Sequence, residues 1–86
     1  MHKDWSDAAW EEYVAWQTKD PKILARINQL IRDTDRDPFH GAGKPEPLKG
    51  EFSGWWSRRI DKGNRLIYRV RGGVLEIAQC GTHYTR

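Results

Sequence analysis

The sequence predicts an α+β fold, in which two N-terminal helices pack on a twisted antiparallel sheet. Two observations indicate this class. Apolar residues recur at helical spacing in the first half of the chain, and three short runs of strand composition, separated by turn residues, fill the second half. The 86 residues suffice for one small core, so we expect a single domain that spans residues 1–86.

The first helix is expected to follow a short polar segment, so any strand that precedes it is expected to be short. Ser6 is a good N-cap for this helix, and Trp5 can pack against Trp10 one turn later. The apolar face of the helix is then predicted from its 3-and-4 spacing. It consists of Trp10, Tyr13, Val14 and Gln17.

A second helix is predicted between Asp20-Pro21 and Asp37-Pro38. At its start, aspartate serves as the cap and proline occupies the first turn. The short link at Thr18-Lys19 favours an antiparallel pairing of the two helices. The apolar face of the second helix consists of Ile23, Ile27, Leu30 and Ile31, with Leu24 at its edge.

Residues 38–54 are rich in glycine and proline and are predicted to form a loop. The loop is long for so small a domain, and long ordered loops often carry function. The three runs that follow, 55–60, 65–71 and 74–80, are split by "DKGN" and by Gly72-Gly73. These turn signals predict an antiparallel meander of three strands.

The two turns also predict the register of the strands. A two-residue turn at Gly72-Gly73 pairs Tyr68 with Ile77 and Leu66 with Gln79, on the face that we expect to contact the helices. The same register pairs Arg69 with Glu76 on the other face, so we leave Arg69 out of any site.

In the first hairpin, a three-residue loop 61–63 with Gly63 in the left-handed conformation places Arg59 opposite Arg65. Two adjacent guanidinium groups repel each other unless an anion lies between them. This pair would lie next to the strand end that leads to His83 and Tyr84.

The charge of the chain is unevenly distributed. The formal net charge is +3, with −2 in residues 1–43 and +5 in residues 44–86. A basic half on a small domain suggests a polyanionic partner, with nucleic acid first, although an ordinary solvated surface remains an alternative.

No apolar run approaches the ~20 residues of a membrane helix, and no secretory signal is evident. One cysteine, Cys80, excludes an internal disulfide framework and suits a cytoplasmic location.

The stretch "GKPEPLKG" holds one carboxylate, Glu46, between two prolines, with Lys44 and Lys49 on either side. Proline restricts its own backbone and that of the preceding residue, and nearby cations favour an ionised carboxylate. A stiff surface loop with ordinary charges is the alternative interpretation.

Together, these residues suit the cleavage of RNA without a metal or cofactor. Glu46 can take the proton from a 2′-OH, and His83, whose usual pKa is about 6.5, can protonate the leaving 5′-oxygen. Arg59 and Arg65 offer forked donors to the phosphate, and Tyr84 can bind the phosphate or stack on a base. Lys44 and Lys49, which flank Glu46, would bind the anionic RNA backbone. A single cysteine and three scattered histidines give no zinc signature.

Other interpretations stay open for several of these residues. The final His-Tyr can be an ordinary tail, and Arg58 can be either structural or a phosphate ligand. Trp55 can stack on a base or fill an interface, whereas Trp56 is assigned to the core.

Four segments resemble the YoeB (Txe) family of bacterial toxins within the RelE superfamily. They are "INQLIRDTDRDPFHGAGKPEPLKG", "SGWWSRRI", "NRLIYRV" and the terminal "HY". The resemblance covers nearly the whole chain and implies two helices on a twisted antiparallel sheet, related in outline to small microbial ribonucleases. It implies a toxin that cleaves mRNA in the A site of the 70S ribosome by metal-free acid–base chemistry. The family's catalytic residues fall on Glu46, Arg65, His83 and Tyr84, and its RNA-binding positions include Lys49 and Arg59.

The resemblance also implies a YefM-like antitoxin as partner and a homodimer. Three departures from the family pattern stand out: a polar first strand, "HKDW"; Gly81-Thr82, where a basic and an aromatic residue are expected; and Thr85-Arg86 after the tyrosine. The main alternative is a module of the same fold that binds RNA or the ribosome without cutting. A DNA-binding or antitoxin role is disfavoured, because no helix-turn-helix or disordered tail is evident.

Overall fold

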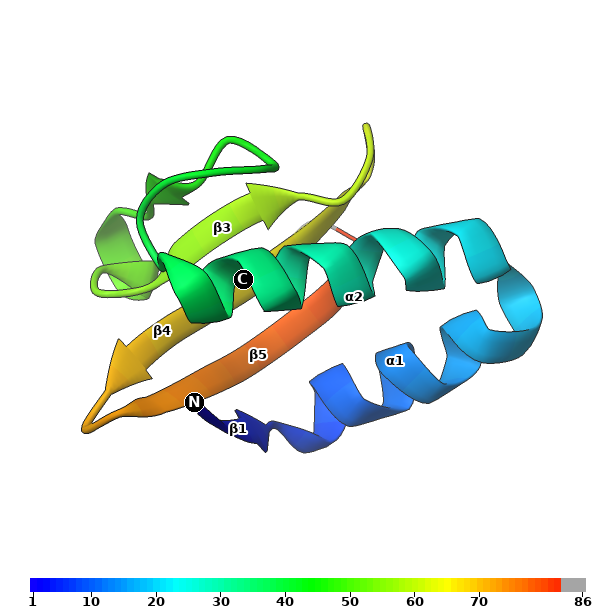
Figure 1. Ribbon diagram of the computed structural model, residues 1–86, viewed down its shortest axis with the longest axis horizontal. Helices are drawn as coiled ribbons and strands as arrows, with labels where there is room; N and C mark the ends of the chain where they lie inside the picture. The colour runs from blue at the N-terminus through cyan, green and yellow to red at the C-terminus, as the bar shows by residue number, and fades with distance from the viewer. Residues whose placement is uncertain (83–86) are drawn as a thin grey trace.

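The computed structural model describes residues 1–82 and contains two helices packed on one face of a five-stranded sheet (Figure 1). The fold class predicted from the sequence is confirmed. The strands lie in the order β1-β5-β4-β3-β2. The elements are β1 (His2–Trp5), α1 (Asp7–Lys19), α2 (Pro21–Arg36), β2 (Glu46–Pro47), the 3₁₀ helix η1 (Gly50–Phe52), β3 (Trp56–Arg59), β4 (Asn64–Arg71) and β5 (Val74–Thr82).

The sheet is mixed, because β1 runs parallel to β5 while the other neighbouring strands are antiparallel. Parallel neighbours need a long crossover, and the two helices with β2 to β4 provide it. The short, polar β1 lies at the edge of the sheet, where its charged side chains remain in contact with water. Within the described part of the chain, no helix is long and apolar enough to cross a membrane.

Helix α1 begins as predicted but turns a different face to the core. The Ser6 hydroxyl accepts a hydrogen bond from the Ala9 amide at 3.0 Å, and the rings of Trp5 and Trp10 meet at 5.8 Å. The predicted face was wrong except at Tyr13, because Gln17 is exposed and Trp10 and Val14 are 48% and 42% exposed. The side chains that pack on the core are Ala9, Tyr13 and Trp16. The Trp10 ring instead meets Trp5 edge-on and stacks on Tyr13, with ring centroids 5.9 Å apart. The small, fully buried Ala9 allows α1 to approach the sheet.

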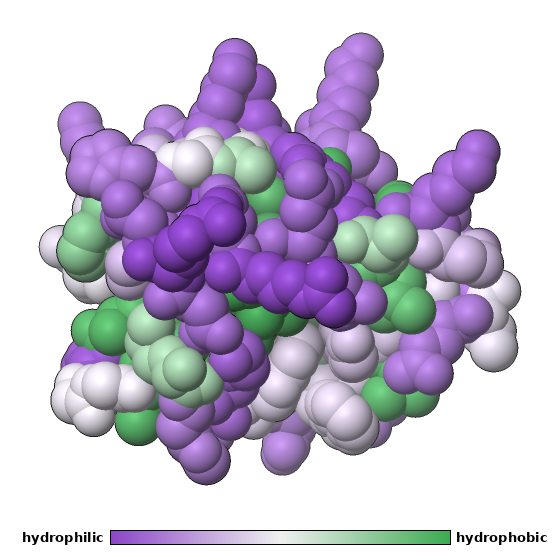
Figure 2. Space-filling model, viewed as in Figure 1, coloured by the Kyte–Doolittle hydropathy of each residue, from purple (hydrophilic) through white to green (hydrophobic). Residues whose placement is uncertain are grey.

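Helix α2 has the predicted caps and the predicted apolar face. The Asp20 carboxylate accepts hydrogen bonds from the amides of Lys22 and Ile23 at 3.0 and 3.4 Å. Ile27, Leu30 and Ile31 are buried against the sheet, while hydrophilic side chains cover most of the face that α2 turns to solvent (Figure 2).

A β-bulge changes the predicted register between β4 and β5. Tyr68 pairs with Ile77 and Arg69 with Glu76, as predicted, but Ile67 pairs with Gln79 and Leu66 with Cys80. Ala78 is the extra residue, and its carbonyl accepts a hydrogen bond from the Ser6 hydroxyl at 2.8 Å. Because one inserted residue reverses the side-chain alternation beyond it, Cys80 enters the core in place of the polar Gln79.

Two local predictions in the loops need correction. Gly63 does not adopt the left-handed conformation; the Asp61 carboxylate instead accepts hydrogen bonds from the amides of Gly63 and Asn64 at 2.9 and 2.8 Å. The segment predicted as one loop, residues 38–54, contains β2 and η1. Even so, the predicted pairing of Arg59 with Arg65 is confirmed.

Candidate functional site

The candidate site lies on the face of the sheet that is turned away from the helices. Glu46 on β2 pairs with Ser57 on β3, and Arg59, two residues further along β3, pairs with Arg65 on β4. Side chains alternate along a strand, so Glu46, Ser57, Arg59 and Arg65 share one face. On such a face, direct and diagonal neighbours are typically about 5 Å and about 7–8 Å apart. The structure thus brings three of the predicted site residues together.

The cations at this site have no carboxylate partner in the described part of the chain. Arg65 Nη1 donates to the carbonyls of Asp61 and Asn64 at 2.9 and 3.1 Å, and these neutral acceptors orient the guanidinium without cancelling its charge. Within residues 1–82, Lys44, Lys49, Arg59 and Arg65 form no ion pair. The site therefore presents positive charge around Glu46, as an anionic backbone requires.

Backbone geometry holds the segment before Glu46 against β3. Gly43 and Lys44 both have positive φ, 83° and 53°. The Arg59 amide donates to the Gly43 carbonyl at 2.6 Å. A Cβ at Gly43 would lie 2.9 Å from Leu30 Cδ2 and 3.0 Å from the Arg59 carbonyl oxygen, so only glycine fits. Left-handed backbone at a residue other than glycine is uncommon, so Lys44 marks a constrained turn.

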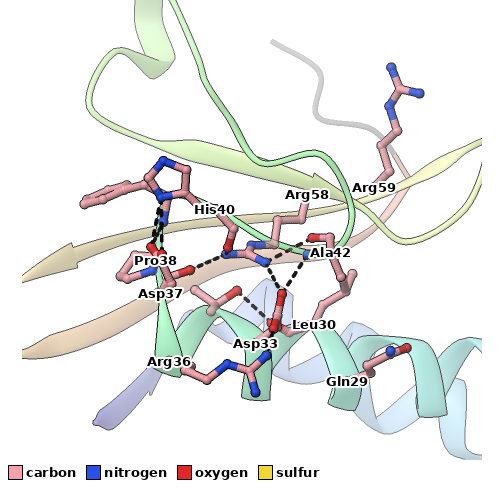
Figure 3. A network of polar contacts seen from close by, with 12 residues as sticks. Gln29, Leu30, Asp33, Arg36, Asp37, Pro38, His40, Ala42, Arg58 and Arg59 are labelled. Atoms are coloured by element: carbon pink, nitrogen blue, oxygen red, sulfur yellow. Dashed lines mark hydrogen bonds and ion pairs between the residues drawn. The ribbon is translucent and has the colours of Figure 1, made fainter.

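Arg58, next to Arg59 on β3, points to the opposite face and is completely buried (Figure 3). Its Nη1 donates to Asp33 Oδ2 and to the Ala42 carbonyl, both at 3.0 Å. Its Nη2 donates to the carbonyls of Asp37 and His40 at 2.6 and 3.0 Å. The sequence left a structural or a phosphate-binding role open, and these bonds show a structural one.

Two further side chains complete the surroundings of Arg58. Arg58 Nε donates to the Tyr68 hydroxyl at 3.2 Å, and that hydroxyl donates in turn to the Pro38 carbonyl. Burial raises the pKa of Tyr68, which keeps the phenol protonated and able to donate. Asp33 accepts from the Ala42 amide at 2.6 Å, and this bond, helped by Arg36 and Arg58, lowers the pKa of its carboxyl.

Arg69 is confirmed as the partner of Glu76. This ion pair lies on the outer face of the sheet, and the Arg69 guanidinium stacks 4.1 Å from the ring centroid of Trp55. The hydrogen bond from Arg69 lowers the pKa of Glu76. Trp55 therefore contacts a neutralised arginine rather than the free cations of the site.

The end of β5 is held by two side chains of α1, which sequence reasoning missed. Glu12 Oε1 accepts from the Cys80 amide at 2.9 Å, and Trp16 Nε1 donates to the Cys80 carbonyl at 2.8 Å. A Cβ at Gly81 would lie 2.5 Å from Glu12 Oε2. The spacing of four residues between Glu12 and Trp16 on one helix was the available signal, but nothing in it indicated their partner.

Cys80 is buried, and desolvation followed by the charge of Glu12 raises its pKa to about 12. The thiol is therefore no nucleophile at neutral pH.

Among residues 1–82, no group of His, Cys, Asp and Glu is placed to hold a metal ion. The predicted residues His83 and Tyr84 lie outside the described residues. The last described strand pairs, Arg65–Gly81 and Asn64–Thr82, lie directly before them in the chain.

Comparison with known proteins identifies the family of this chain. The family model for YoeB-like toxins of bacterial type II toxin–antitoxin systems matches residues 5–84. Toxin YoeB of Escherichia coli strain K12 is 52% identical over 80 residues, which cover 93% of this chain and 95% of that toxin.

Solved structures of two toxins share the fold over nearly their whole length. A YoeB/ParE toxin from Agrobacterium tumefaciens matches with a TM-score of 0.95 and 48% identity, covering 98% of this chain and 100% of that one. YoeB from Staphylococcus aureus, solved as a dimer and in a heterotetrameric complex with YefM, matches with a TM-score of 0.90 and 39% identity, covering 98% of both chains. The chain therefore belongs to the YoeB family of toxins from bacterial type II toxin–antitoxin systems.

Proposed function

We propose that this toxin is a ribosome-dependent endoribonuclease that cleaves mRNA in the ribosomal A site and so stops translation. One observation carries the proposal: Glu46 shares a face of the sheet with the paired cations Arg59 and Arg65, which have no ion-pair partner within residues 1–82. A carboxylate beside two free guanidiniums suits a phosphodiester, because the base and the phosphate ligands reach neighbouring atoms of the same nucleotide.

In the proposed reaction, the Glu46 carboxylate accepts the proton of the 2′-OH while the 2′-oxygen attacks phosphorus. The bond from phosphorus to the 5′-oxygen breaks, and protonated His83 gives its proton to that leaving oxygen. Arg59 and Arg65 stabilise the charge that develops on the phosphorane, and Tyr84 binds the phosphate or stacks on a base. The products are a 2′,3′-cyclic phosphate and a 5′-hydroxyl. This scheme uses neither a metal nor a cofactor.

The openness of the site supports dependence on the ribosome. Glu46, Lys44, Lys49 and Arg59 are all exposed to solvent. An open face holds RNA weakly and does not exclude water, so another macromolecule, here the ribosome, would have to position the mRNA. Lys44 and Lys49 would bind the RNA backbone on either side of Glu46, and the ribosomal A site would orient the scissile bond.

The partners of the related S. aureus YoeB support a similar assembly here. That toxin has been solved as a dimer and with YefM. We therefore propose that this chain forms a homodimer, is neutralised by a YefM-like antitoxin, and acts in the cytoplasm, where its ribosomal target lies.

The test is cleavage of a defined mRNA on programmed ribosomes. Wild type, Glu46→Gln and His83→Gln are each assayed with and without ribosomes, and Glu51→Gln serves as control, because Glu51 is an exposed carboxylate on η1. We expect A-site cleavage by wild type and by the control, with losses of about 100-fold or more in the other two variants. If wild type bound ribosomes and left the mRNA intact, a non-catalytic ribosome-binding module would replace this proposal.

A further inference from the structure

We propose that Arg58 is a positioning residue for Glu46: from the helix side of the sheet, it fixes the loop that places the carboxylate beside Arg59 and Arg65. The inference rests on the proposed function, in which Glu46 is the base. Arg58 touches no part of the substrate in this scheme and acts through the backbone.

Arg58, on β3, connects the end of α2, the loop that follows α2, and β4. Its five donor hydrogens are matched by five acceptors: Asp33 on α2, Tyr68 on β4, and the carbonyls of Asp37, His40 and Ala42 in the loop. A buried charge is unfavourable unless every hydrogen bond is made, and replacing both members of a buried ion pair by well-packed apolar residues is often neutral or stabilising. A guanidinium whose five donor hydrogens all have acceptors is therefore better explained by a role in fixing the path of the loop than by filling the core.

The segment between this anchor and Glu46 has little freedom. Gly43, Lys44 and Pro45 separate Ala42 from Glu46. Gly43 accepts the hydrogen bond from the Arg59 amide, Lys44 has a φ of 53°, and the proline ring fixes its own φ. A shift of the Ala42 carbonyl would thus be passed on to Glu46 rather than absorbed in between.

β3 connects the anchor to the reacting groups. Ser57 pairs with Glu46, Arg58 binds the loop, and Arg59 pairs with Arg65, on three consecutive residues. In Figure 3, Arg58 points into the loop carbonyls above α2, whereas Arg59 points away from them. The base and the phosphate-binding cations are therefore placed relative to the same short strand.

The expected effect concerns the chemical step. A misplacement of about 1 Å can cost about 100-fold in rate, whereas the long, exposed side chains of Lys44 and Lys49 can still reach an RNA backbone after a shift of that size. Arg58→Lys keeps the charge but cannot match five acceptors with three donors. We expect its kcat on programmed ribosomes to fall by about tenfold or more while KM stays within about twofold of wild type.

The control is Arg36→Lys. Arg36 pairs with the same Asp33, but its side chain is 79% exposed and it contacts none of the three loop carbonyls. We expect wild-type kcat and KM for this variant. Circular dichroism and thermal melting establish that each variant is folded before kinetics are measured.

A double-mutant cycle separates positioning from general damage. If Arg58 acts through Glu46, then Glu46→Gln with Arg58→Lys is no slower than Glu46→Gln alone. Hydrogen exchange of the Arg59 amide, which donates to Gly43, reports loop movement without any activity and should be faster in Arg58→Lys. If Arg58→Lys fails to fold, Tyr68→Phe takes its place; it removes the acceptor of one Arg58 bond and the donor to the Pro38 carbonyl, with an expected loss of about threefold.

Each outcome supports or overturns the inference. A fall in kcat that disappears in the Glu46→Gln background supports it. An unchanged kcat, or a loss that adds fully to that of Glu46→Gln, overturns it while leaving the proposed function intact. A wild type that does not cleave overturns the proposed function and this inference together.

Discussion

The loop that carries Glu46 and the strand end that leads to His83 are both held by side chains from other elements, but by different means. The loop is tied by a buried guanidinium that makes five hydrogen bonds and one ion pair. The end of β5 is held by two hydrogen bonds between α1 and the backbone of Cys80, and the two side chains that make them, Glu12 and Trp16, are only partly buried.

The difference predicts two kinds of failure. Losing Arg58 removes the donor to three loop carbonyls and breaks the buried ion pair with Asp33, which keeps only the Ala42 amide and the exposed Arg36 as partners, so the stability of the whole fold should fall. Losing one bond at Cys80 leaves the core intact, so the strand end should open locally while the rest of the protein stays folded. The buried hydrogen bonds of Arg58 would thus hold Glu46, the proposed base, rigidly, whereas the two bonds to Cys80 would let the end of β5 open more easily.

The largest expected effect separates two adjacent arginines. Arg58→Met should lower the free energy of unfolding by about 3–5 kcal/mol, because one partner of a buried ion pair is removed. Arg59→Met, at an exposed position, should change it by no more than about 0.5 kcal/mol. Urea denaturation of both variants measures the difference. Equal losses would show that burial of Arg58 does not support the loop.

A smaller effect depends on acid. The pKa of Asp33 is lowered in the folded protein, chiefly by the bond from the Ala42 amide, so its ionised form stabilises the fold above the usual aspartate pKa. This contribution is lost as pH falls below about 4, through the folded pKa. Asp33→Asn should therefore be less stable than wild type near neutral pH, and the gap should close in acid.

Urea midpoints of wild type and Asp33→Asn across this range provide the measurement. Asp37 and Glu76 also have lowered pKa values and destabilise both proteins in acid, so only the difference between the two reports Asp33. A difference in urea midpoint that stays constant with pH would contradict the stabilising role given to the charge of Asp33.

The smallest expected effect lies at the end of β5. Trp16→Phe removes the donor to the Cys80 carbonyl and should cost about 1 kcal/mol of global stability. In wild type, burial and a pKa of about 12 protect the Cys80 thiol from alkylation. Alkylation should become faster in Trp16→Phe through local opening. Trp10→Phe, which changes an exposed ring on the same helix, is the control. Equal rates of Cys80 alkylation in the two variants would show that the Trp16 bond does not hold the end of β5.

The sequence predicted best the features that are set by neighbouring residues. The caps at Ser6 and Asp20 depend on side chains within three residues, and the pairing of Arg59 with Arg65 depends on the length of one tight loop. Since these determinants are local, residue type and spacing were enough to find them.

Features that depend on distant residues were missed. The bulge at Ala78, which exchanged Gln79 for Cys80 in the core, involves a bond from Ser6 at the other end of the chain. The face of α1 was wrong because exposed Trp10 and Val14 are as apolar as buried residues. Arg58 could not be assigned, because its acceptors come from three separate segments, most of them backbone carbonyls that any residue would offer.

The order of the strands has a consequence for how this toxin is made. β5 lies between β1 and β4 in the sheet. β1, which leaves the ribosome first, can therefore join the sheet only after β5, the last strand, has been made. Until β5 is made, the inner face of α1 also lacks its main packing surface, which includes Ile77 and Cys80. Such distant pairings form late in folding. We therefore expect a nascent chain to remain without a completed sheet through most of its own translation, which, under the proposed function, would spare the ribosome that is producing it.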